Sequence, residues 1–95
     1  MLDRVLDVLR GRSDELRARG ILRAWVFGSV ARREDHAASD VDLVFEAILG
    51  VQTFDIMDFE EALTAELGRE VSIVTLGGLD RVRHSEIFRD MTPAF

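Results

Sequence analysis

Hydrophobic residues at intervals of three and four predict helices in four parts of the chain. The first helix covers residues 2–20 and ends at a glycine, and a short helical turn is expected at 30–33. A third helix is expected to be capped by Thr53 or Asp55 and to be closed by the glycine after residue 67. The last covers 79 to about 91 and is stopped by Pro93. The apolar positions that indicate the three longer helices are Leu2, Val5, Leu6, Leu9, Leu16, Ile56, Phe59, Leu63, Leu67, Val82, Ile87, Phe88 and Met91.

Three short segments between these helices have the character of strands. Residues 21–27 form a compact apolar run with aromatic residues, 40–46 alternate between apolar and polar positions, and 71–76 are rich in β-branched residues. In the second strand one face carries Val41, Leu43 and Phe45, and the other carries Asp40, Asp42, Val44 and Glu46. The sequence therefore predicts a sheet with one packed face and one face that presents two aspartates.

Composition restricts the class of protein. Ninety-five residues with 47% hydrophobic and 32% charged side chains are ordinary for one globular domain. No apolar run approaches the ~20 residues of a membrane helix, and the first ten residues do not resemble a secretory signal. Cysteine is absent, which excludes disulfides, thiolate metal sites and cysteine nucleophiles. We therefore expect a cytoplasmic protein without membrane attachment.

The charge is negative and unevenly distributed. The net charge of −6 disfavours broad binding to nucleic acid, because such binding depends on neutralising many phosphates. Residues 1–33 contain eight arginines and four acids, whereas 34–95 contain four arginines and fourteen acids. Every basic residue is arginine, so the lysine of a P-loop is absent. This uneven charge is compatible with a local basic face beside an acidic centre, and acidic clusters often hold cations.

The stretch 28–43 contains the residues that indicate chemistry. Asp40 and Asp42 lie two apart on a strand, so they share a face, with Cα atoms roughly 6.5–7 Å apart. Paired carboxylates without cysteine or clustered histidine suit Mg²⁺, whose typical ligands are one or two protein carboxylates together with substrate phosphates. Gly28 ends the first strand and lets an anion approach the backbone, and Ser29 adds a hydroxyl where helical amides begin. These features together describe a site for a nucleoside triphosphate with Mg²⁺. The alternative is a solvated strand face with no ligand.

This stretch resembles the signature of the DNA polymerase β-type nucleotidyltransferases. Gly28-Ser29 is followed by ten residues and then by Asp40-Val41-Asp42. The flanking residues resemble those of the small stand-alone branch, the minimal nucleotidyltransferases. The resemblance extends to the leading helix, the helix that ends in Leu67-Gly68 and the strand after it, and so covers nearly the whole chain.

The resemblance implies a fold and a set of roles. The fold would be α/β (α+β), a small mixed sheet with helices mainly on one face, forming a single domain over residues 1–95. Gly28 and Ser29 would hold the β- and γ-phosphates of ATP, and Asp40 and Asp42 would bind two Mg²⁺ ions. A hydroxyl would attack the α-phosphate in line and release pyrophosphate. Arg32 matches an arginine of the family and would contact phosphate or anchor the loop.

Two positions depart from the family pattern. Arg33 stands where glycine is common. Ser72 stands where a third acid usually helps to hold the metal and accepts the proton of the attacking hydroxyl. Serine is far too weak a base for that task. Glu70 and Glu46 have the right strand parity, but both lie too far along their strands to be obvious substitutes.

The resemblance also implies a partner. Minimal nucleotidyltransferases typically accompany a HEPN protein, which in many pairs is an RNase toxin, and some act as antitoxins that transfer AMP to a toxin tyrosine. This chain has no tyrosine, so such an acceptor must lie on another protein. The alternatives are a weakly catalytic antitoxin that neutralises its toxin by binding, and an enzyme that modifies a small molecule or RNA. The sequence leaves the oligomeric state, the acceptor and the nucleotide base open.

Overall fold

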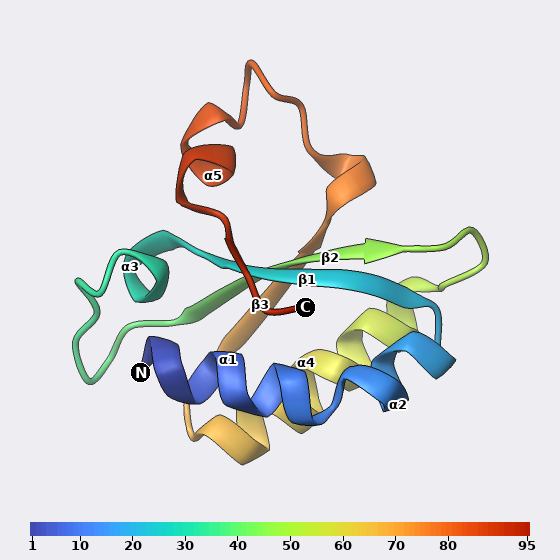
Figure 1. Ribbon diagram of the computed structural model, residues 1–95, viewed down its shortest axis with the longest axis horizontal. Coiled ribbons are helices and arrows are strands. Elements are labelled where there is room, and N and C mark those ends of the chain that lie inside the picture. The colour runs from blue at the N-terminus through green and yellow to red at the C-terminus, as the bar shows by residue number, and fades with distance from the viewer.

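The computed structural model describes all of residues 1–95 (Figure 1). The helices are α1 (Leu2–Gly11), α2 (Ser13–Ala18), α3 (Gly28–Ala31), α4 (Thr53–Leu67) and α5 (Ser85–Asp90), with a 3₁₀ turn at Leu76–Gly78. The strands are β1 (Ile21–Phe27), β2 (Val41–Ala47), β3 (Val71–Thr75) and β4 (Thr92–Pro93). The three strands expected from the sequence are present, and β4 is an addition.

The strands form one mixed sheet in the order β3-β2-β1-β4. Strand β1 is antiparallel to both of its neighbours, β2 and β4, whereas β2 and β3 are parallel. The parallel pair is connected through α4, as a parallel connection requires. This topology places the end of β1 beside the beginning of β2, and the beginning of β2 beside the beginning of β3.

The helices α1, α2 and α4 lie together under one face of the sheet, whereas α5 lies on the other side (Figure 1). The main hydrophobic core lies between the sheet and the three lower helices, and it includes the ring contact of Phe45 with Phe59, whose centroids are 6.1 Å apart. On the opposite face Val44 is fully buried, although it lies outside that core cluster. We attribute its burial to the segment 76–91, which covers this face. The expected small mixed sheet with helices mainly on one face is therefore confirmed.

Helix α4 ends where the sequence predicts, but its N-terminal cap is neither Thr53 nor Asp55, the two residues expected from the sequence. The residue that caps it is Gln52, and the Asp55 carboxylate accepts a hydrogen bond of 2.9 Å from the Gln52 backbone N–H, which forms a capping box. Its other end is closed by Gly68 with φ of +71°, a left-handed conformation that favours glycine.

The first and last predicted helices are wrong in extent. The first is interrupted at Arg12, which has φ −101° and ψ 4°, so α1 and α2 are separate. The last is short because Asp80 directs the residues that follow it into a turn: its carboxylate accepts hydrogen bonds from the backbone N–H groups of Val82 and Arg83. Beyond α5 the chain joins the sheet edge, where Pro93 pairs with Trp25 instead of ending a helix.

None of the helices combines the length and the apolar character needed to cross a bilayer.

Candidate functional site

Gly28 lies directly against the carboxylate of Asp42. Phe27, the last residue of β1, is the register partner of Asp42 on β2, so the turn at Gly28 begins beside that side chain. Gly28 has φ of +72°, and a Cβ added there would lie 2.7 Å from Asp42 Oδ2. Glycine is therefore favoured at this position for both its conformation and its lack of a side chain. The structure brings together the two halves of the motif that the sequence indicated.

Asp40 and Asp42 differ in their surroundings. Asp40 is exposed and lies just before β2, which begins at Val41 and not at Asp40 as expected. Asp42 is partly buried, and burial raises the pKa of its carboxyl, with the nearby charge of Asp40 raising it further. A cation bound beside Asp42 would offset the negative charge of Asp40 that disfavours ionisation of Asp42. This donor set fits Mg²⁺, which accepts one or two carboxylates from the protein.

Ser72 is the register partner of Asp42 on the parallel strand β3. Partners in adjacent strands project from the same face of a sheet, so the Ser72 hydroxyl stands where a third carboxylate would join the aspartates. Accordingly, no group of three or more acidic, histidine or cysteine side chains in the molecule is arranged to hold a metal ion. The candidate site offers two carboxylates and one hydroxyl.

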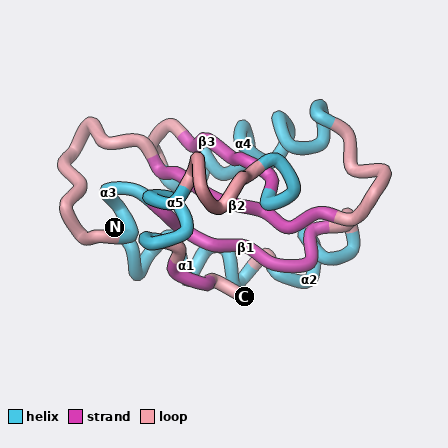
Figure 2. The backbone as a smooth tube through the Cα atoms, turned by 90° about the horizontal axis from the view of Figure 1, so that it is seen from above, coloured by secondary structure: helices cyan, strands magenta, loops and turns pink.

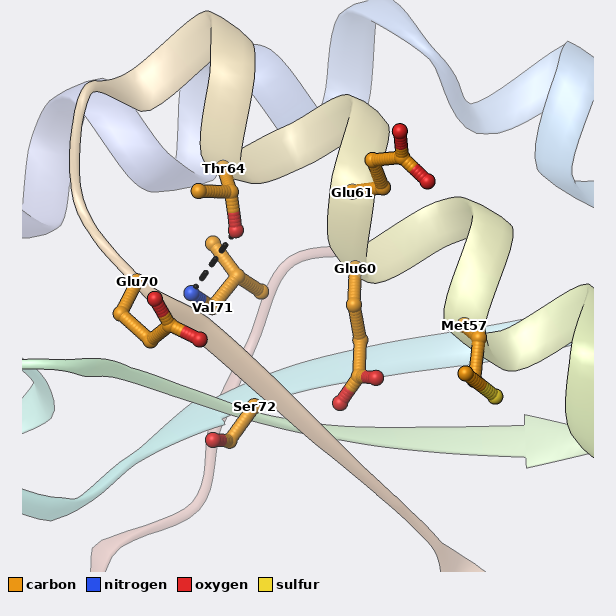
Figure 3. A pocket seen from close by; sticks show the side chains of 7 residues that line it. All are labelled: Met57, Glu60, Glu61, Thr64, Glu70, Val71 and Ser72. Atoms are coloured by element: carbon orange, nitrogen blue, oxygen red, sulfur yellow. Dashed lines mark hydrogen bonds between the residues drawn. The ribbon is translucent and has the colours of Figure 1, made fainter.

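A groove of about 380 Å³ runs along the free edge of β3, against α4. The groove is lined by Met57, Glu60, Glu61, Thr64, Glu70, Val71 and Ser72, and the Ser72 side chain points away from α4 (Figure 3). In Figure 3 the side chains of Glu60 and Thr64 extend from α4 toward the strand. Thr64 Oγ1 accepts a hydrogen bond of 3.0 Å from the Val71 N–H, and Glu60 Oε2 accepts one of 2.9 Å from the Ile73 N–H.

These two bonds give Glu60 a structural role. Backbone N–H groups on an edge strand invite pairing with another chain, and the side chains of Glu60 and Thr64 satisfy them instead. Glu60 is therefore more than a solvated residue on the surface of α4. Glu60 and Thr64 are four residues apart and share a helix face, which is the sequence signal that could have indicated their common role. Because its carboxylate is engaged, Glu60 does not replace the missing third acid.

Ser29 and Arg32 lie on the turn that follows β1. Ser29 is half-exposed on α3, and Arg32 ends that helix. Arg32 donates from Nε to Glu34 at 3.1 Å and from Nη1 to Asp90 at 2.5 Å. These two carboxylates raise the pKa of the Arg32 guanidinium. Arg32 therefore joins α3 to the end of α5, a contact that the sequence did not indicate.

The loop between α3 and β2 is held by ion pairs and a local turn. Arg33 has a left-handed φ of +59° and pairs with Asp3 of α1 at 2.9 Å. Arg69 donates to Asp35 at 3.0 Å, and both side chains are largely buried. Ser39 Oγ accepts a hydrogen bond from the His36 N–H, which closes a local turn in this loop. The left-handed φ explains why glycine would suit position 33.

Comparison with known proteins identifies the family. Residues 14–92 match the family described as polymerase beta, nucleotidyltransferase, and the chain belongs to it. A protein of Methanocaldococcus jannaschii with the provisional name protein adenylyltransferase is 31% identical over 71 residues, covering 75% of this chain and 76% of that protein. The resemblance recognised in the sequence is thereby confirmed.

Solved structures agree with this assignment. A structure described as a minimal nucleotidyltransferase is 34% identical, with a TM-score of 0.75 over 93% of this chain and 94% of that one. A toxin–antitoxin complex with AMP-PNP has a TM-score of 0.74 at 18% identity, over 90% of this chain and 72% of that one. A chain from the complex of a tri-AMPylated Shewanella oneidensis HEPN toxin with its MNT antitoxin has a TM-score of 0.66 at 15% identity, over 95% and 71%. The last two similarities demonstrate a shared fold.

Proposed function

We propose that this protein is a Mg²⁺-dependent protein adenylyltransferase that transfers AMP from ATP to a hydroxyl of a HEPN toxin, and so acts as its antitoxin. The observation that carries the proposal is the contact between the Gly28 turn and the Asp42 carboxylate. A turn that can receive phosphate and a carboxylate that can hold a cation meet there, as Mg²⁺-ATP requires.

Each residue of the motif has a part in this proposal. The backbone at Gly28 and the Ser29 hydroxyl hold the terminal phosphates, and the absence of a Cβ at Gly28 leaves room beside Asp42. Asp40 and Asp42 supply the carboxylates for Mg²⁺, whose chemistry when bound is to neutralise charge on the phosphates and to orient the attacking oxygen. Arg32 supplies a guanidinium near the same turn. Together these groups position the α-phosphate for in-line attack by the acceptor oxygen, and pyrophosphate leaves.

Support for the donor and the acceptor comes from the similar proteins. The relative named as a protein adenylyltransferase supports AMP transfer to a protein, and the complex with AMP-PNP supports ATP as the nucleotide. The AMPylated HEPN toxin bound to an MNT antitoxin supports the class of partner. This chain contains no tyrosine, so a tyrosine acceptor lies on the partner. The proposal places the protein in the cytoplasm, where ATP is available.

The experiment is incubation of the purified protein with the HEPN protein encoded in the same genome, with ATP and Mg²⁺, followed by intact mass measurement. We expect increments of one AMP on the partner and none in the combined variant Asp40→Asn/Asp42→Asn. Glu46→Gln is the matched control, because it removes a carboxylate from the same face of β2, where Glu46 faces Arg23 at 3.9 Å. Control and wild type should modify the partner equally. An unchanged partner mass at saturating ATP would contradict the proposal.

A second function is favoured by Ser72. Since Ser72 occupies the position opposite Asp42, the chain lacks a carboxylate that could accept the proton of the attacking hydroxyl. The protein would then neutralise its toxin by binding alone. In that case the variant Asp40→Asn/Asp42→Asn neutralises the toxin fully, whereas the adenylyltransferase proposal requires that neutralisation be lost. Ser72→Asp should raise transfer if the missing acid limits the native enzyme.

A further inference from the structure

The guanidinium of Arg32 lies between two carboxylates from different parts of the fold. Asp90, the last residue of α5, accepts from Nη1 at 2.5 Å, and Glu34 accepts from Nε at 3.1 Å. The Asp90 side chain is only 15% exposed, whereas that of Glu34 is 67% exposed. Because solvent screens an exposed charge more strongly, Asp90 is the stronger electrostatic partner of Arg32.

The position of Arg32 relates this ion pair to the phosphate turn. Arg32 follows Ser29 by three residues, and side chains at that spacing are neighbours on a helix. Arg32 is the residue that ends α3, so its backbone lies within about one helical turn of Ser29. Helix α5 lies next to α3 (Figure 2), which brings Asp90 to Arg32. Asp90 thus holds the guanidinium of the arginine that, in the proposed function, lies beside the bound phosphates.

We propose that Asp90 competes with the phosphates of a nucleoside triphosphate for Arg32, and that it thereby sets the nucleotide affinity of this site. The inference rests on the proposed function, in which the turn at Gly28 and Ser29 receives ATP. Without nucleotide, Asp90 holds Arg32 and joins α5 to α3. With nucleotide, the guanidinium exchanges the Asp90 carboxylate for phosphate oxygens, which accept charge-assisted hydrogen bonds as the carboxylate does. Asp90 is accordingly a positioning residue that acts through Arg32.

Electrostatics determines the direction of the effect. One guanidinium between two carboxylates leaves a local charge of −1, so an incoming phosphate is repelled while Asp90 remains charged. The substitution Asp90→Asn keeps the size and the hydrogen-bond acceptor but removes the charge. Because this change removes the repulsion between Asp90 and the incoming phosphates and releases Arg32, we expect Asp90→Asn to bind ATP about tenfold more tightly, which corresponds to about 1.4 kcal/mol.

The experiment is isothermal titration of the full chain with ATP in the presence of Mg²⁺. Asp90→Asn should tighten binding about tenfold and Asp90→Glu should restore the wild-type affinity. Glu34→Gln is the matched control, because it removes the other carboxylate on Arg32, and it should change affinity by less than about twofold owing to its exposure. Thermal melts of each variant establish that it is folded.

The decisive comparison removes Arg32. Arg32→Gln and the combined variant Arg32→Gln/Asp90→Asn should bind ATP with the same affinity, because Asp90 acts only through the guanidinium. Unchanged or weaker binding by Asp90→Asn overturns the inference, as does tightening that persists without Arg32 or that Glu34→Gln reproduces. If wild type and Asp90→Asn both fail to bind ATP, the proposed function itself fails. If the wild type binds ATP and transfers AMP but Asp90→Asn binds no more tightly, only the inference about Asp90 fails.

Discussion

Gly28→Ala tests the contact on which the candidate site depends. The substitution adds one methyl group at a position with φ of +72°, and that methyl would lie 2.7 Å from Asp42 Oδ2. It therefore introduces two separate effects, a strained backbone and a clash with a candidate metal ligand. Gly68 provides a matched control, because its φ of +71° is nearly identical and nothing lies within 4 Å of an added Cβ.

The magnitudes follow from these two geometries. Alanine in the left-handed region costs about 1 kcal/mol relative to glycine, and both variants share that cost. In Gly28→Ala the Asp42 carboxylate must also retreat by about 0.7 Å to reach an ordinary contact distance. Because the atom is the end of a flexible side chain, we expect an off-rotamer cost of about 0.5–1.5 kcal/mol. The total is about 2 kcal/mol for Gly28→Ala and about 1 kcal/mol for Gly68→Ala.

The assays are urea denaturation for stability and calorimetric titration with Mg²⁺-ATP for the site. Gly68→Ala should bind Mg²⁺-ATP like the wild type. Gly28→Ala should bind at least about tenfold more weakly, because a ligand displaced by several tenths of an ångström no longer fits its cation. In an Asp42→Ala background the additional cost of Gly28→Ala should disappear, which leaves about 1 kcal/mol. Equal destabilisation by the two glycine substitutions, with Mg²⁺-ATP binding intact in both, would refute the proposed contact.

Three further predictions concern stability. Arg33 has φ of +59°, so Arg33→Gly should be about 1 kcal/mol more stable in urea than Arg33→Ala. Both variants lose the exposed ion pair with Asp3, but only alanine keeps the backbone strain. Equal midpoints of urea unfolding would contradict this prediction. Burial and the charge of Asp40 raise the pKa of Asp42, so the protonated carboxyl stabilises the fold below its unfolded pKa, and this stabilisation is lost as pH rises through the folded pKa. Asp42→Asn should therefore have a higher melting temperature than the wild type at pH 7, and the two melting temperatures should converge in acid. The hydrogen bond from Arg69 lowers the pKa of Asp35, so the ionised Asp35 stabilises the fold above its unfolded pKa, and this stabilisation is lost as pH falls through the folded pKa. Asp35→Asn should therefore lose less stability on acidification than the wild type. If both proteins lose stability in parallel as the pH falls, this ion pair does not contribute to the pH dependence.

The strands and the central helix could be predicted from the sequence because their patterns are local. The first strand spans residues 21–27 as expected, and α4 ends before Gly68, since glycine adopts the required left-handed conformation at low cost. The spacing of Gly28 to Asp42 indicated a phosphate turn beside a carboxylate pair. The two outer helices were predicted less well because a short side-chain turn, such as the one at Asp80, overrides helical periodicity.

The sequence by itself determined the family, the strand pattern and the motif residues, because these depend on residue type and on short intervals along the chain. Only the tertiary structure placed Ser72 opposite Asp42, since that pairing depends on the register of two parallel strands. The bond from Arg32 to Asp90 joins residues 58 positions apart, and the bond from Ile73 to Glu60 depends on how α4 packs against an edge strand. Such contacts follow from the packing of whole elements, which no local pattern encodes. They decide which carboxylates are free for a cation and which are already engaged.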